Sequence, residues 1–94
     1  METGPDKISV ILKVYGRVQG VGFRYYAQKK AEELHLKGFV KNRPDGSVYI
    51  EAEGNSDNLE AFVLWCEMGP SWARVSKVEK QQIPLQGYTG FEIH

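Results

Sequence analysis

The sequence predicts an α+β fold in the order β-α-β-β-α-β, with two helices covering one face of an antiparallel sheet. Residues 8–15 and 48–52 carry an apolar side chain at every second position, which is typical of strands with one buried face. Apolar residues in 23–34 and 59–66 recur instead at helical spacing. Because each predicted helix lies between two predicted strands, we expect two right-handed crossovers joined by a central hairpin.

The first half of the chain supplies the first strand and the first helix. The strand is expected over Ile8 to Tyr15 and ends at Gly16. The helix buries one stripe of side chains, which consists of Phe23, Ala27, Ala31 and Leu34. Gly38 is expected to close the helix, since glycine readily adopts the left-handed conformation found at helix C-termini.

A hairpin and a second helix follow. Residues 39–42 are expected to form a strand, Pro44-Asp45-Gly46 a turn, and residues 48–52 the returning strand. The cluster Asn55-Ser56-Asp57-Asn58 offers several N-cap side chains for the second helix, and Asp57 with Glu60 resembles a capping box. Residues 73–83 contain a fourth strand, and residues 91–93 can add a short last one. This order is the ferredoxin-like split arrangement, which hosts many unrelated functions.

Length and composition indicate one small globular domain. A chain of 94 residues with 41% hydrophobic and 26% charged residues is expected to fold as a single domain over residues 8–94, with residues 1–7 flexible. The one cysteine, Cys66, cannot form an internal disulfide, and its place on the second helix indicates a buried thiol. With no apolar run long enough to cross a membrane and no signal-peptide pattern, we expect a cytoplasmic monomer without a membrane partner.

The charge distribution argues against a general nucleic-acid binder. Twelve basic residues balance twelve acidic ones, so the formal net charge is zero. Residues 1–48 nevertheless contain nine basic and five acidic residues, whereas residues 49–94 contain three and seven. A positive first half could attract a small anion, although a solvated helix face would give the same pattern.

The segment 16–24, between the first strand and the first helix, carries the strongest functional signal. A helix N-terminus presents unpaired backbone amides and a partial positive charge, and glycines let such amides turn toward one oxyanion. Gly16, Gly20 and Gly22 lie in this segment, and Arg24 in the first helical turn could add a guanidinium. The spacing fits neither a Walker loop nor a dinucleotide fingerprint, and no arginine stands six residues after Cys66 for a cysteine phosphatase.

Two longer motifs stand out, VYGRVQGVGFR at residues 14–24 and GFVKNRPDGSV at residues 38–48, the second followed by Gly54. They resemble the first and second signatures of the acylphosphatase family. The likeness extends over most of residues 8–94, although Ser71-Trp72 is bulkier than the family pattern leads us to expect. The resemblance implies hydrolysis of an acyl phosphate to a carboxylate and inorganic phosphate, with no metal or other cofactor.

The resemblance also implies a role for particular residues. Arg24 would bind the phosphoryl group, and Asn42 would position the attacking water. The phosphate-binding loop would consist of Gln19, Gly20, Val21, Gly22, Phe23 and Arg24. From position alone, Arg24 could equally be a surface arginine, Asn42 a turn residue, and the Arg17 and Gln19 side chains solvent-facing.

Two other functions are compatible with the fold. An RNA-binding module would expose aromatic side chains among basic residues on its central strands, but Tyr49 stands beside Glu51 and Glu53. A non-catalytic module that senses phosphate or handles carbamoyl phosphate is the other alternative. The paired signatures favour the enzyme.

Overall fold

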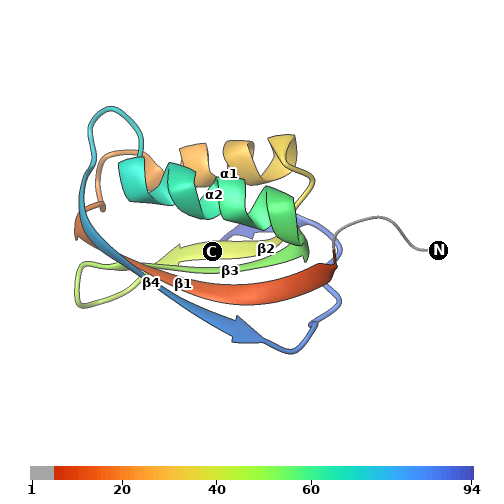
Figure 1. Ribbon diagram of the computed structural model, residues 1–94. Coiled ribbons are helices and arrows are strands. Elements are labelled where there is room, and N and C mark those ends of the chain that lie inside the picture. Colours follow the sequence, from red (N-terminus) through yellow and green to blue (C-terminus); the bar gives the residue numbers. More distant parts are fainter. Residues whose placement is uncertain (1–5) are drawn as a thin grey trace.

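The computed structural model describes residues 6–94, and it confirms the predicted α+β fold. Both helices lie on one face of a five-stranded sheet with the strand order β4-β1-β3-β2-β5 (Figure 1). The elements are β1 (Lys7–Arg17), α1 (Phe23–Glu33), β2 (Lys37–Asn42), β3 (Val48–Asn55), α2 (Ser56–Met68), β4 (Arg74–Ile83) and β5 (Phe91–Ile93). Most of the N-terminal segment predicted to be flexible, residues 1–5, lies outside the described residues, and β1 begins at Lys7.

The sheet is mixed rather than antiparallel, which corrects the sequence prediction. β1 pairs antiparallel with β3 and β4, and β2 pairs antiparallel with β3. β5 instead runs parallel to β2, with Gly38 opposite Phe91 and Val40 opposite Ile93. β4 runs antiparallel to the direction of β2. The chain reverses its direction after β4, so β5 runs in the same direction as β2 when it pairs with that strand. β1 also continues past Gly16, with a register shift against β4 between Tyr15 and Gly16.

Gly38 does not close the first helix, as the sequence suggested. His35 takes the left-handed conformation at φ 59°, and the Leu36 amide donates to the Ala31 carbonyl at 2.8 Å, as in a Schellman motif. Gly38 lies inside β2 at φ 144°, where a Cβ atom would come within 1.8 Å of the Glu51 carbonyl oxygen. The glycine therefore permits close approach of β2 and β3.

The predicted capping box at Asp57 is also wrong, because the helix begins earlier. Asn55 is the N-cap of α2, and its side-chain oxygen accepts hydrogen bonds from the amides of Asp57 at 2.9 Å and Asn58 at 3.3 Å. Asn55 is also the last residue of β3, so one side chain ends the strand and opens the helix.

The hydrophobic core lies between the sheet and the two helices. It contains the alternating side chains of β1 and β3 and one stripe of each helix, and Trp65 packs on Phe23 at 5.4 Å between ring centroids. The buried hydrophobic residues are Val10, Leu12, Val14, Val18, Phe23, Ala27, Ala31, Leu36, Val40, Val48, Ile50, Ala52, Leu59, Phe62, Cys66, Ala73 and Phe91. Among the described helices, none is long and apolar enough to span a membrane.

Cys66 is expected to be unreactive in the folded protein. Its side chain is fully buried in the core, and this burial raises the pKa of the thiol. The fold therefore favours the neutral thiol. The free energy of unfolding begins to fall once the pH exceeds the thiol pKa of the unfolded chain, and it goes on falling until the pH passes the raised value. Iodoacetamide labelling followed by mass spectrometry should be slow in buffer and fast in urea. Fast labelling of the native protein would contradict the burial.

Candidate active site

The β1–α1 loop places a row of free amides at the start of α1. Gly22 is the N-cap and has left-handed geometry, at φ 80° and ψ 14°, which a residue with a side chain rarely adopts. Within residues 6–94, the amide N–H groups of residues 19–23 donate no hydrogen bond to a protein acceptor. The loop therefore presents unpaired donors beside the positive end of the helix dipole, the arrangement that binds a phosphate or another oxyanion.

Arg24 and Asn42 meet at one pocket beside this loop. Arg24 is half-buried in the first turn of α1, whereas Asn42 is exposed at the end of β2. The pocket has a volume of about 220 Å³ and is lined by Val18, Gly20, Gly22, Phe23, Arg24, Tyr25, Asn42 and Ile93. No Asp or Glu side chain is among these lining residues, and Arg24 is the one charged side chain in this set. Two residues that are well separated in the sequence thus share one concave site.

The end of the chain holds the Arg24 side chain, a feature that sequence reasoning missed. The Arg24 Nη1 atom donates a hydrogen bond to the His94 carbonyl oxygen at 2.8 Å. His94 is fixed in turn by its amide, which donates to the Val40 carbonyl at 2.8 Å, and by its ring, which stacks on Phe39 at 4.6 Å between centroids. No motif signals this contact, because it depends on the parallel pairing of β5 with β2.

The Gln19 side chain points toward the β2–β3 hairpin rather than into the pocket. Its Nε2 atom donates to the carbonyl oxygens of Arg43 at 2.7 Å and Ser47 at 2.8 Å. These two bonds use both of its side-chain N–H groups. The backbone amide is therefore the only N–H group of Gln19 that could face a phosphate. Val21, another residue of the predicted phosphate-binding loop, lines a neighbouring pocket. The Gln19 side chain therefore connects the β1–α1 loop, through two hydrogen bonds, to the β2–β3 hairpin that follows Asn42.

Removing the two Gln19 side-chain hydrogen bonds should lower the turnover number. We expect Gln19→Ala to reduce kcat about tenfold, because small displacements of a positioned group reduce rate strongly. The inhibition constant of inorganic phosphate should change by less than about threefold, since the amides and Arg24 remain. Gln81→Ala, at an exposed position on β4, is the matched control. A kcat for Gln19→Ala equal to that of the control would show that these hydrogen bonds do not position Asn42.

Asp45 holds the turn that follows Asn42. Its Oδ1 atom accepts hydrogen bonds from the Ser47 hydroxyl at 2.6 Å and from the Ser47 amide at 2.9 Å. These bonds, the side-chain one first, lower the pKa of the Asp45 carboxyl. The turn is therefore stabilised above the pKa of this group in the unfolded chain, and the stabilisation is lost as the pH falls through the lowered value.

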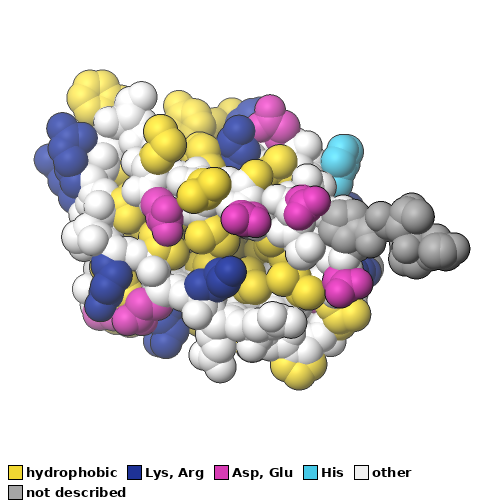
Figure 2. Space-filling view, viewed as in Figure 1, with side chains coloured by type: hydrophobic (Ala, Val, Ile, Leu, Met, Phe, Trp, Pro, Cys, Tyr) yellow, Lys and Arg dark blue, Asp and Glu magenta, His cyan; other side chains and the backbone are white. Residues whose placement is uncertain are grey.

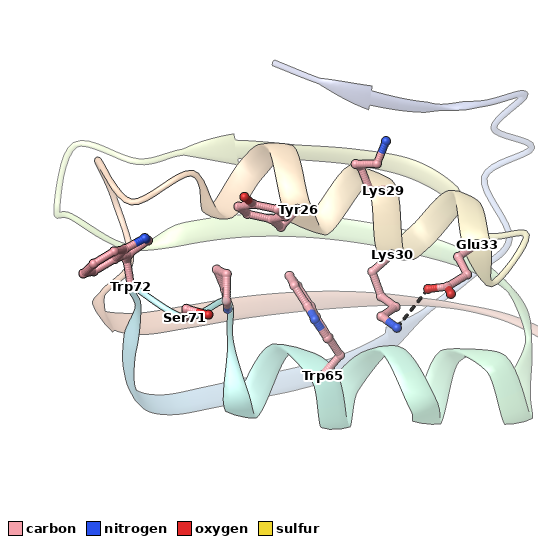
Figure 3. Close-up of a pocket in the computed structure, with 8 residues that line it drawn as sticks. Tyr26, Lys29, Lys30, Glu33, Trp65, Ser71 and Trp72 are labelled. Atoms are coloured by element: carbon pink, nitrogen blue, oxygen red, sulfur yellow. Dashed lines mark ion pairs between the residues drawn. The ribbon is translucent and has the colours of Figure 1, made fainter.

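A larger pocket of about 620 Å³ lies between α1 and α2, away from these groups. Figure 3 shows Tyr26, Lys29 and Lys30 on one side and Trp65 on the other, and Lys30 pairs with Glu33 at 2.9 Å. The pocket contains neither the free amides nor Arg24, and its cations are Lys29 and the Lys30 that is paired with Glu33. Among residues 6–94, no group of three or more His, Cys, Asp or Glu side chains is placed to bind a metal.

The face of the sheet opposite the helices does not resemble an RNA-binding surface. Phe39 and Tyr49 stack there at 6.0 Å, and Lys41 lies over both rings, but Glu51 accepts a hydrogen bond from the Tyr49 hydroxyl at 2.7 Å. Tyr88 also packs edge-on against Phe39 at 6.1 Å and donates a hydrogen bond to Glu51. The aromatic rings are thus engaged by neighbouring protein groups, and a carboxylate lies among them, which disfavours a nucleic-acid backbone.

Comparison with known proteins agrees with the geometry of the pocket. A model of the acylphosphatase family matches residues 10–93. An acylphosphatase of Synechococcus sp. (strain WH7803) is 50% identical over 80 residues, which are 85% of this chain and 80% of that protein. The structure of an acylphosphatase from Coxiella burnetii has a TM-score of 0.92 and 38% identity, and the match covers 95% of this chain and 94% of that one.

Similar structures include a larger protein as well. The crystal structure of full-length HypF in the phosphate- and nucleotide-bound form has a TM-score of 0.86 and 28% identity, and the match covers all of this chain but 12% of that one. The family match spans both signatures, the β1–α1 loop and the β2–β3 hairpin. The chain belongs to the acylphosphatase family and hydrolyses acyl phosphates.

Proposed function

We propose that Arg24 and the amides of the β1–α1 loop hold the phosphoryl group of the substrate while Asn42 positions the water that attacks it. The observation that carries this proposal is the shared pocket: free amides, the Arg24 guanidinium and the Asn42 amide line one cavity with no carboxylate in its wall. Phosphoryl transfer depends mostly on alignment and on stabilising negative charge on the equatorial oxygens. The loop amides and the Arg24 guanidinium can align the phosphoryl group and stabilise the negative charge on its oxygens.

The substrate explains why the site needs so little further chemistry. The carboxylate released from an acyl phosphate is a good leaving group, so neither a strong general acid nor a covalent nucleophile is required. The Asn42 amide has no useful pKa near neutrality and cannot act as a base, but its oxygen can accept a hydrogen bond from water and fix its direction. The proton of the attacking water passes to the phosphate of the substrate itself, which then leaves as inorganic phosphate.

Several other properties belong to the same proposal. Residues 8–94 act as a single catalytic domain that needs no metal or other cofactor. The protein works as a monomer, a proposal supported by the fact that the β1–α1 loop, α1, β2 and β5 of one chain supply every lining residue of the pocket. A cytoplasmic location, without nucleic-acid or membrane partners, fits the single buried Cys66 and the balanced charge.

Hydrolysis of benzoyl phosphate by the purified protein tests the proposal. We expect benzoate and inorganic phosphate in equal amounts, with no change in rate on adding EDTA. Arg24→Ala serves as the inactive control, because contaminating phosphatases would survive that substitution. A rate lost on chelation and restored by magnesium would contradict the metal-free mechanism. An equal rate in the Arg24→Ala preparation would contradict the proposed site.

A further inference from the structure

A second pocket adjoins the phosphate loop, and Asn42 is not among its lining residues. It has a volume of about 500 Å³ and is lined by Arg17, Gly20, Val21, Trp72 and Arg74. Gly20 lines this pocket and the phosphate pocket alike, and a Cβ atom at Gly20 would point into open space. The two pockets are therefore neighbours across a glycine. The acyl part of a substrate whose phosphoryl group lies by Arg24 has open space to extend over Gly20.

Two arginines face each other in this second pocket. Arg17 at the end of β1 pairs in register with Arg74 at the start of β4, so their side chains project from the same face of the sheet. Like charges at directly opposed positions destabilise a sheet. In the part of the chain that the structure describes, neither arginine forms an ion pair, and no carboxylate lines the pocket. Both side chains are exposed, so solvent screens much of this repulsion, and Arg74 Nη1 donates a hydrogen bond to the Ala73 carbonyl at 3.1 Å. The remaining guanidinium donors are available to a bound anion.

The rest of the pocket wall is apolar. Trp72 is 76% exposed, an unusual state for a large hydrophobic side chain, and Val21 is half-buried. Figure 3 shows Trp72 on the loop after α2, and this residue also lines the 620 Å³ pocket between the helices. Figure 2 shows basic side chains gathered at the end of the molecule where this loop lies, beside a hydrophobic one. A ligand there would contact an indole face and two guanidinium groups.

We propose that this pocket, formed by Arg17, Val21, Trp72 and Arg74, binds the acyl part of the substrate and favours acyl phosphates that carry a second anionic group, a carboxylate or a phosphate. The apolar spacer of the substrate lies against Trp72 and Val21, and its distal anion accepts hydrogen bonds from the two guanidinium groups. The assignment rests on the proposed function, because it requires the phosphoryl group to lie by Arg24. It gives a role to Trp72 and explains why two unpaired arginines are opposed.

Two aromatic acyl phosphates of similar shape test the proposal: one carries a carboxylate in the para position of the benzoyl ring, and the other carries a methyl group there. The selectivity ratio is the kcat/KM measured with the carboxylate substrate divided by the value measured with the methyl substrate. Comparing this ratio between the unmodified protein and its variants cancels the intrinsic reactivity of the substrates. We expect the ratio to fall about fivefold in Arg17→Gln and in Arg74→Gln, the upper end for an exposed ion pair. The ratio in the unmodified protein should also decline as the salt concentration rises.

Lys77→Gln is the matched control, because Lys77 is an exposed cation on the same strand as Arg74 and lies outside the pocket. Its selectivity ratio should equal that of the unmodified protein. Arg17→Gln and Arg74→Gln should unfold at the same or higher urea concentration than the unmodified protein, since each relieves a repulsion. That measurement separates loss of the anion contact from loss of folding.

The results distinguish failure of the pocket assignment from failure of the proposed function. If both substrates are hydrolysed but the selectivity ratio is unchanged in both arginine variants, or falls equally in Lys77→Gln, the anion-selecting pocket is wrong and the proposed function stands. If the unmodified protein hydrolyses neither substrate, the proposed function fails and the pocket assignment fails with it. A benzoyl phosphate with a para phosphonate that is preferred over the carboxylate would identify the distal group as a phosphate rather than a carboxylate.

Discussion

Arg24→Ala should lose turnover and phosphate binding together. The guanidinium is the charged side-chain group of the 220 Å³ pocket. In the proposed mechanism it stabilises both the bound phosphate and the transition state. We expect kcat/KM to fall by a factor on the order of 10³ or more, as for other arginines that stabilise a transferring phosphoryl group. Inhibition by inorganic phosphate should disappear over the range that inhibits the unmodified protein. Steady-state kinetics on benzoyl phosphate with phosphate as inhibitor measures both effects.

Two further variants test whether the effect of Arg24→Ala is due to loss of the Arg24 guanidinium itself. Lys29→Ala removes an exposed cation from the same helix, outside the phosphate pocket, and should retain full activity. Arg24→Lys keeps the charge but loses the planar guanidinium that can both donate to the His94 carbonyl and reach a phosphate, so it should recover only part of the binding. If Arg24→Ala binds phosphate as tightly as the Lys29→Ala control, Arg24 is not the phosphoryl-binding group.

Asn42→Ala should lower the rate of catalysis without weakening phosphate binding, whereas Arg24→Ala should impair both. Asn42 lines the pocket from the end of β2, and it belongs to neither the loop nor the helix that is proposed to bind the anion. We therefore expect the inhibition constant of phosphate to stay within a factor of about two, while kcat falls by about a hundredfold or more, as on losing one preorganised polar group. Comparing KM, kcat and phosphate inhibition in one set of assays separates the two effects.

Lys41→Ala is the control for this second experiment, because it alters the neighbouring residue on β2 outside the pocket. It should leave both constants close to those of the unmodified protein. A parallel loss of phosphate affinity in Asn42→Ala would place Asn42 in the anion-binding group and contradict its role in aiming water.

The sequence was sufficient to predict the elements that bury apolar faces. Period-two and helical patterns predict β1, β3 and both helices, since burial constrains every second or every third to fourth residue. The loop with Gly20, Gly22 and Arg24 was found from its glycines and its place before a helix, and the structure brings it together with Asn42 at one pocket. These features are local in sequence or repeat with a period.

Features set by contacts between distant segments could not be predicted. Gly38 gave a helix-end signal, but its position is required by the approach of β2 to β3. The parallel β5 strand follows from the reversal after β4, and it alone brings the His94 carbonyl to Arg24. The Gln19 side chain depends on a hairpin 24 to 28 residues away. None of these pairings leaves a periodic trace in the sequence.

A crystal structure of the protein grown with inorganic phosphate tests the central claim most directly. We predict one phosphate within hydrogen-bond distance of the backbone amides of residues 20–23 and of the Arg24 guanidinium, with the Asn42 amide oxygen directed at a water beside the phosphorus atom. A phosphate bound elsewhere, with the loop amides facing only solvent and Asn42 turned away from Arg24, would contradict the account.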